Sequence, residues 1–180
     1  MQHKNFGRNQ IFQPSAAYTP ADEREVLQIL DRHRGQRIRA IGRLHSWSEA
    51  VLGDAVLLDL RRLNDIRLQP DGDQFVATVG AGCQIKRLLK ELDRDGATLH
   101  SLGLITEQTI AGAISTGTHG SGRHSMSHYV VGVRLARYDA STGRAFIEEL
   151  NAGEQLQAAR CSLGSLGIIL SVKLRCRAQY

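Results

Sequence analysis

Two glycine-bearing stretches hold the residues of this chain that are best suited to bind a ligand. Residues 103–122 read GLITEQTIAGAISTGTHGSG and combine five glycines with nine Ser, Thr, Gln, Glu or His residues. Because ordered glycine costs conformational entropy, its repetition indicates positive φ angles or a backbone that comes close to a ligand. Rows of N–H groups flanked by hydroxyls suit a phosphate. The alternative is a small-residue helix packed tightly between two flexible loops, and no Walker-type GxxxxGK[ST] or GxGxxG motif decides between the two.

The second stretch is the turn at residues 42–48, GRLHSWS, which follows a short apolar segment at residues 38–41. A hydroxyl-rich turn at the carboxyl end of a strand is a common place for ligand contact in α/β proteins. His45 lies in this turn and His119 lies in the first stretch, whereas His100 precedes the first stretch and suits either the core or a ligand contact.

Other chemistries have little support. The HExxH pair of a zinc helix is absent, and we expect no metal site. The GxSxG turn of a serine hydrolase is absent too, and residues 162–167, SLGSLG, resemble it only loosely. Hydrolase chemistry is therefore disfavoured.

Composition limits the class of protein. A chain of 180 residues with 42% hydrophobic content suits one compact domain or two small subdomains that share a core. The net charge of +5 comes from scattered basic residues, which favours an anionic small ligand or a partner surface over nucleic acid. Three cysteines without a CxxC pair indicate a reduced, cytoplasmic setting. Since no segment approaches the roughly 18 apolar residues of a membrane span, we expect a soluble protein.

The elements that must position these stretches follow from periodicity and turn signals. Residues 1–18 are interpreted as an irregular arm. Thr19 is the expected cap of a helix over residues 20–34, which begins at Pro20. Further helices are expected at residues 84–94 and 152–159. Strands are expected at residues 38–41, 55–60, 66–68, 75–79, 130–138, 145–150 and 168–177, the last one antiparallel and half exposed. The mixture of helices with hairpins predicts an α+β fold in two layers.

Several motifs together resemble the FAD-binding (PCMH-type) domain of the vanillyl-alcohol-oxidase flavoprotein family, in its aldonolactone and alditol oxidase branch. They are Asn5-Phe6-Gly7, then IRAIGRLHSWS, LLDLRRLNDI, ATVGAGCQIKRLLKEL, LGLITEQTIAGAISTGTHGSG and GSLGIILSVKLR, in family order over nearly the whole chain. The resemblance implies two α/β subdomains with FAD held between them. It divides the chain into an N-terminal arm at residues 1–18, subdomain 1 at residues 19–82 and subdomain 2 at residues 83–180.

The same resemblance implies the cofactor contacts. The turn at residues 42–46 is expected to wrap the pyrophosphate, the stretch at residues 102–122 to line the flavin and phosphates, and the start of the last strand to meet the adenine. The expected contacts are Gly42, Arg43, Leu44, His45, Ser46, Gly103, Thr106, Thr109, Gly112, Ala113, Thr116, Thr118, His119, Gly120, Ile168 and Ile169. His45 occupies the place of the histidine that is often bonded to the flavin's 8α-methyl group. Ala111 matches a position beside the isoalloxazine where side-chain size affects access of dioxygen.

The activity that this resemblance implies is oxidation of a CH–OH group of a sugar lactone or alditol, with dioxygen or another acceptor reoxidising the flavin. In this family a C-terminal cap domain supplies the substrate pocket and the acid–base groups. That domain is expected to be absent from these 180 residues, so no catalytic residue is named. The alternatives are a related FAD oxidoreductase acting on another hydroxy substrate and a flavin-binding module without turnover.

Overall fold

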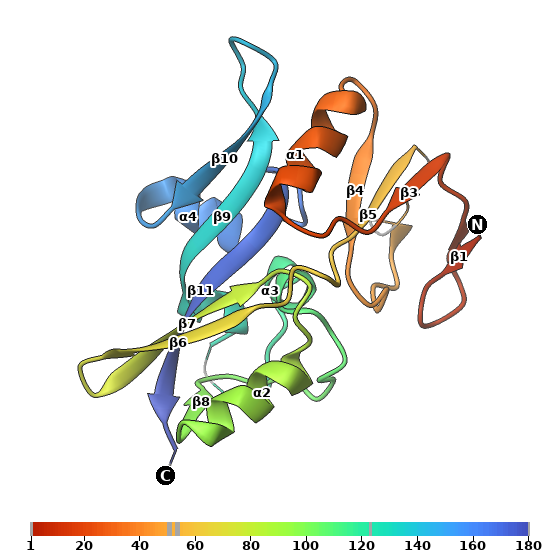
Figure 1. Ribbon diagram of the computed structural model, residues 1–180. Coiled ribbons are helices and arrows are strands. Elements are labelled where there is room, and N and C mark those ends of the chain that lie inside the picture. The colour runs from red at the N-terminus through yellow and green to blue at the C-terminus, as the bar shows by residue number, and fades with distance from the viewer. Residues whose placement is uncertain (1, 50–51, 53–54, 123, 180) are drawn as a thin grey trace.

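The computed structural model describes residues 2–49, 52, 55–122 and 124–179. Figure 1 shows a small sheet near the N-terminus and a larger sheet built from the rest of the chain. The small sheet has the order β3 (Ala16–Tyr18), β5 (Val56–Asp59), β4 (Ile38–Ile41), and its strands are parallel. Val56, Leu57 and Leu58 of the central strand are buried, as their continuous apolar run predicts.

Helix α1 (Glu23–Arg32) connects β3 to β4 and buries Val26, Ile29 and Leu30. It begins three residues later than predicted from Thr19 and Pro20. Asp22 is the actual cap, and its carboxylate accepts a 2.8 Å hydrogen bond from the Glu25 N–H. An aspartate satisfies this free N–H group and also places negative charge at the positive end of the helix dipole.

The larger sheet has the order β10 (Ala145–Leu150), β9 (Val130–Tyr138), β11 (Ile168–Ala178), β7 (Gln74–Gly80), β6 (Ile66–Asp71), and β8 (Ala97–Leu99) also pairs with β11. The predicted antiparallel pairing of β11 is confirmed, and its side chains alternate between buried and partly exposed from Leu170 to Cys176. The strands at residues 66–80 lie in this larger sheet, whereas the sequence grouped them with the first subdomain.

In the described part of the chain, the further helical segments that pack around these sheets are α2 (Ile85–Arg94), α3 (Ile110–Ser115), η2 (Met126–Tyr129) and α4 (Gly153–Arg160). Residues 110–115 form the short small-residue helix that is one of the two interpretations of this stretch. One continuous apolar core joins both sheets, since Leu58 of β5, Leu88 of α2 and Leu174 of β11 belong to the same buried cluster. The described part of the chain has no helix that is long and apolar enough to cross a membrane.

The N-terminal arm is more ordered than its sequence indicates. Strands β1 (His3–Lys4) and β2 (Ile11–Phe12) form an antiparallel hairpin, and β3 then joins the small sheet. Strands of two or three residues are too short to show a period, which is why the sequence predicts an irregular segment here.

Candidate functional site

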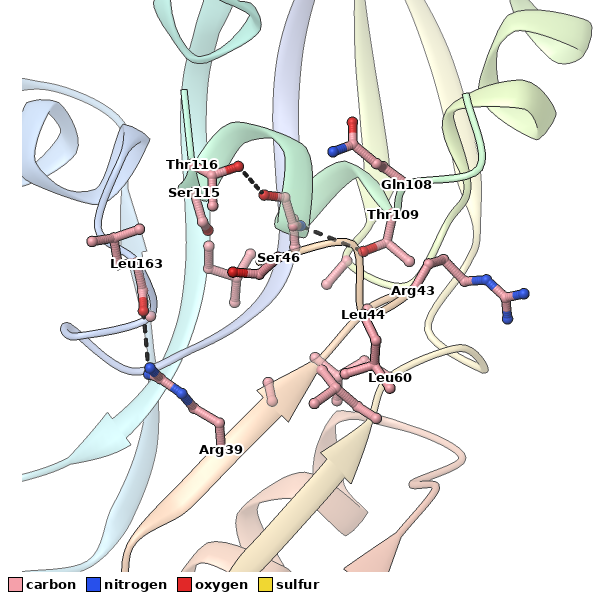
Figure 2. A pocket seen from close by; sticks show the side chains of 18 of the residues that line it. Arg39, Arg43, Leu44, Ser46, Leu60, Gln108, Thr109, Ser115, Thr116 and Leu163 are labelled. Atoms are coloured by element: carbon pink, nitrogen blue, oxygen red, sulfur yellow. Dashed lines mark hydrogen bonds between the residues drawn. The ribbon is translucent and has the colours of Figure 1, made fainter. Parts of the chain in front are cut away.

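The two glycine-bearing stretches meet in the structure. The turn at residues 42–46 follows β4, and Gly42 lies against Thr109, the cap of α3. A Cβ atom built at Gly42 would overlap the Thr109 Oγ1 atom. Thr109 Oγ1 in turn accepts a 3.4 Å hydrogen bond from the Gly112 N–H, which fixes the start of α3 beside the turn (Figure 2). Two chain segments approach each other so closely here that position 42 requires a residue without a side chain.

A cavity of about 310 Å³ lies where these segments meet. This volume falls at the lower end of the roughly 300–1,000 Å³ that small-molecule sites enclose. The cavity brings together most of the predicted contact residues, from three separate parts of the chain. They are Gly42, Arg43, Leu44, His45, Ser46, Thr109, Gly112, Thr116, Ile168 and Ile169.

The remaining predicted residues, Gly103, Thr106, Ala113, Thr118, His119 and Gly120, do not line this cavity. Ala113 is fully buried in the core on the other face of α3. A Cβ atom at Gly103 would lie 2.8 Å from Thr118 Cγ2, and one at Gly120 would overlap the Leu102 carbonyl oxygen. These two glycines, in the segments that flank α3, therefore allow neighbouring chain segments to pack closely.

His45, which lines the cavity, has a ring nitrogen without a described protein partner. Its Nδ1 atom is buried and has no hydrogen-bond partner among the described residues. The imidazole stacks on the Phe6 ring, with the ring centroids 5.0 Å apart and an interplanar angle of 25°. A buried nitrogen without a protein partner is costly, so this atom is a candidate for contact with a ligand.

The backbone at the preceding residue is strained. Leu44 has a φ of 54°, in the left-handed region that costs a residue with a side chain roughly 1–2 kcal/mol. Its carbonyl oxygen accepts a 2.7 Å hydrogen bond from the Phe6 N–H. Strain of this kind persists where surrounding contacts enforce it, and it is concentrated at binding sites.

The electrostatic character of the cavity suits an anion. Arg39 and Arg43 line it, and none of the described residues in its lining is a carboxylate. Burial, followed by the nearby Arg37 charge, lowers the pKa of Arg39, but a guanidinium stays protonated at neutral pH. Arg39 Nη1 donates a 3.3 Å hydrogen bond to the Leu163 carbonyl (Figure 2), so it connects β4 to the loop that precedes β11.

Sequence reasoning missed this loop as part of the site. Leu163, Gly164 and Gly167 line the cavity, and all three have positive φ angles, of 51°, 75° and 141°. The GSLGIIL motif carries the signal, but the sequence predicts contacts only from Ile168 onward. Ala111, predicted to lie beside the flavin ring, is also in the lining. The other lining residues, which are not among the predicted contacts, are Ile38, Arg39, Ala40, Ile41, Trp47, Leu60, Ala81, Gln108 and Ser115.

The remaining histidines and the three cysteines do not line this cavity. His100 stacks on Tyr129 at 4.5 Å, and His124 stacks on His128 at 4.0 Å. Within the described ranges, no group of three or more His, Cys, Asp or Glu side chains is placed to hold a metal ion. Burial raises the pKa of the Cys83 and Cys176 thiols to about 11, which keeps them protonated and unreactive at neutral pH.

Comparison with known proteins gives this geometry a context. A family model described as "FAD binding domain" matches residues 14–144. A long-chain alcohol oxidase from an uncultured marine euryarchaeote is 86% identical over 179 residues, which are 99% of this chain and 37% of that protein. The L-gulonolactone oxidase of Mus musculus is 30% identical over 100% of this chain and 41% of its own length. The D-arabinono-1,4-lactone oxidase of Eremothecium gossypii is 35% identical over 96% and 33%, respectively.

Among solved structures, the cholesterol oxidase of Brevibacterium sterolicum superimposes with a TM-score of 0.88 at 17% identity. The superposition covers 98% of this chain and 37% of that structure. The mixed α/β architecture with several sheets is therefore a shared fold. The chain spans less than half the length of the relatives it matches.

Proposed function

Because the chain belongs to the FAD-binding-domain family, the PCMH-type domain of the vanillyl-alcohol-oxidase flavoproteins, we propose that the cavity between the residue 42–46 turn and α3 holds its FAD. The observation that carries this proposal is the meeting of Gly42 with Thr109 around a cavity that His45 lines and whose described lining holds arginines but no carboxylate. Arginines, hydroxyls and small residues in the lining fit a ligand with an anionic centre and flat aromatic ends.

Each part of the lining has a proposed role. The turn at residues 42–46 faces the pyrophosphate with its backbone, and Ile168 and Ile169 at the start of β11 border the adenine. Ala111 and Gly112 on α3 leave room for the flavin ring because their side chains are minimal. Gly103, Thr106, Ala113, Thr118, His119 and Gly120 are proposed to act indirectly, by holding α3 and the chain on either side of it.

His45 is the proposed point of covalent attachment. A bond between an imidazole nitrogen and the 8α carbon replaces one hydrogen on each partner. The bond would release two electrons, which dioxygen or another acceptor would take up. His45 Nδ1 is buried and not engaged by a described protein group, so no protein hydrogen bond would compete with this bond.

The proposed reaction is oxidation of a CH–OH group. Bound FAD supplies a two-electron acceptor for the hydride of the carbinol carbon. The residues described here bind and orient this cofactor, whereas the acid–base groups that act on the substrate are proposed to lie in a cap domain outside residues 1–180. The division into an arm, two FAD-binding subdomains and a cap domain is part of this proposal, with residues 66–80 assigned to subdomain 2 because β6 and β7 lie in the larger sheet; so is a cytoplasmic setting.

The substrate class is proposed from the relatives' names. The 86% identical relative is named for long-chain alcohols, which favours a hydroxy substrate other than the sugar lactone or alditol that the sequence motifs suggested. Lactone substrates remain the second candidate, because relatives at 30–35% identity are named for them.

FAD binding is tested by titrating the purified FAD-free protein while recording flavin absorbance and fluorescence. We expect saturable uptake that Ala111→Phe abolishes, because the new ring would fill the cavity. Ala158→Phe is the matched control, since Ala158 is an exposed alanine on helix α4. Failure of the unmodified protein to take up FAD would refute the proposal.

The substrate is tested with a chimera in which residues 1–180 are joined to the C-terminal remainder of the 86% identical relative. Flavin reduction is followed without oxygen, with a long-chain primary alcohol, xylitol or L-gulono-1,4-lactone. Reduction by the alcohol alone supports the first candidate, and reduction by the lactone or alditol alone supports the second.

A further inference from the structure

The N-terminal hairpin lies directly on the turn that carries His45. Strands β1 and β2 pair His3 with Phe12 and Lys4 with Ile11, and residues 5–10 between them contact residues 44–47. The hairpin contributes no residue to the lining of the cavity. Any effect it has on a ligand must therefore pass through the turn.

Asn5 makes the most buried of these contacts, with only 3% of its surface exposed. Its Oδ1 atom accepts a 3.0 Å hydrogen bond from the Gln10 N–H, which closes the hairpin loop. Its Nδ2 atom donates to Asn9 Oδ1 at 2.7 Å and to the Ser46 carbonyl at 2.9 Å. A buried amide with this many partners strongly specifies one local geometry.

Phe6 contacts the two residues before Ser46. Its N–H donates to the carbonyl of Leu44, the residue with the left-handed backbone. Its ring stacks on the His45 imidazole although 64% of the Phe6 surface is exposed. An aromatic side chain left this accessible gains little from burial, so its stacking on His45 is its main described contact.

Further contacts fix the far end of the turn. Asn9 Nδ2 and Gln10 Nε2 donate to the Trp47 carbonyl, at 3.0 and 3.4 Å. Gly7 lies under the indole, because a Cβ atom there would be 2.5 Å from a carbon of the Trp47 ring. The hairpin thus binds the carbonyls of Leu44, Ser46 and Trp47, which flank His45 on both sides.

We propose that the N-terminal hairpin is the device that positions His45 for the flavin, with Asn5 and Phe6 as its positioning residues. Asn5 fixes the backbone after His45 and Phe6 fixes the backbone before it. The Phe6 ring also limits the orientations that the imidazole can adopt. This inference rests on the proposed function of the cavity, and it assigns the hairpin to cofactor binding although no hairpin residue reaches the cavity.

The test combines hydrogen–deuterium exchange of the FAD-free protein with FAD titration. Asn5→Asp keeps the acceptor for the Gln10 N–H but places a carboxylate oxygen against the Asn9 and Ser46 oxygens. We expect amides of residues 42–48 to exchange about tenfold faster in this variant, and the FAD dissociation constant to rise about tenfold. Phe6→Ala should weaken FAD binding and lower the covalently bound fraction, while Phe6→Trp should restore both.

A control variant separates positioning from a general loss of stability. Tyr138→Phe removes the 2.6 Å hydrogen bond from Tyr138 to the Leu30 carbonyl, far along the chain from the turn. It should lower the unfolding temperature without changing exchange at residues 42–48 or FAD affinity. An equal loss of FAD affinity in this control and in Asn5→Asp would overturn the inference.

The remaining outcomes are equally decisive. Unchanged exchange at residues 42–48 in Asn5→Asp would show that the hairpin does not hold the turn. Faster exchange with unchanged FAD affinity would show that the position of the turn is irrelevant to the cofactor. Either result overturns the inference while leaving FAD binding intact. If the unmodified protein takes up no FAD, that result refutes the proposed function and, with it, the role of the hairpin.

Discussion

Gly42 and Thr109 occupy mutually exclusive space: a side-chain carbon on Gly42 would overlap the hydroxyl oxygen with which Thr109 caps α3. Gly42 lies in the connection that follows β4 of the small sheet, and Thr109 lies between β8 of the larger sheet and α3. The cavity lies where these two residues meet. Gly42 is not among the glycines with positive φ, so room, and not conformational freedom, is the constraint at this position.

This relationship predicts coupling between the two positions. Gly42→Ala should lower the free energy of unfolding by about 1–3 kcal/mol through overpacking. Thr109→Ala should cost about 1 kcal/mol through loss of the cap. The double variant should lose less unfolding free energy than the two single variants lose together, because the smaller residue at 109 accommodates the new methyl group. Urea unfolding of the four proteins measures the coupling, and strict additivity would contradict it.

His45→Ala should abolish covalent flavin while leaving non-covalent FAD binding. The measurement is flavin fluorescence of the denatured protein on a gel. His119→Ala serves as the control, since His119 lies outside the cavity lining and its Nδ1 is within 3.0 Å of the Gly120 carbonyl oxygen. A fluorescent band that persists in His45→Ala would refute attachment at this residue.

Arg39→Met should weaken FAD binding several-fold and speed amide exchange at residues 163–167. The substitution removes the hydrogen bond to the Leu163 carbonyl and one positive charge from the cavity. Arg37→Met is the matched control, because Arg37 is exposed two positions earlier on the chain. Equal effects of the two variants would indicate that only net charge matters.

Asp139, in the turn between β9 and β10, makes the stability of the protein depend on pH in the acid range. Hydrogen bonds from the Ser141 hydroxyl, then from the N–H and hydroxyl of Thr142, lower its pKa from 3.8 to about 2. Since the folded-state pKa is depressed, the stabilisation is present above the unfolded pKa near 4 and is lost as pH falls towards 2. Asp139→Asn should lower the unfolding temperature at pH 7 and flatten its decline between pH 4 and 2. An unchanged profile would contradict this assignment.

The sequence predicts the elements of this fold better than their pairing. Long segments with a clear period, such as β11 and α2, lie within a residue or two of their predicted bounds. The two-residue strands β1 and β2 carry no period and were missed. The pairing of β7 with β11 joins residues about a hundred positions apart, which local patterns do not encode.

Sequence-based prediction of the site has the same limit for single residues. Gly42 and Gly120 are both glycines in polar turns, yet Gly42 borders the cavity whereas Gly120 only allows the chain to pass the Leu102 carbonyl. A glycine in a sequence indicates close approach without saying what approaches. Only the three-dimensional structure shows that His45 Nδ1 has no hydrogen-bond partner among the described residues and that Asn5 Nδ2 donates to the Ser46 carbonyl.

Because β11 lies in the middle of the larger sheet, that sheet is completed late in synthesis, after the small sheet. The small parallel sheet is complete once residue 59 has been made, but β7, β8 and β9 all pair with β11, which begins only at Ile168. Until then the larger sheet lacks its middle strand, and the nascent chain exposes strand edges that invite aggregation. Ile168 and Ile169 arrive with that same strand. The cavity that these two residues line is therefore completed only after the start of β11 has been made.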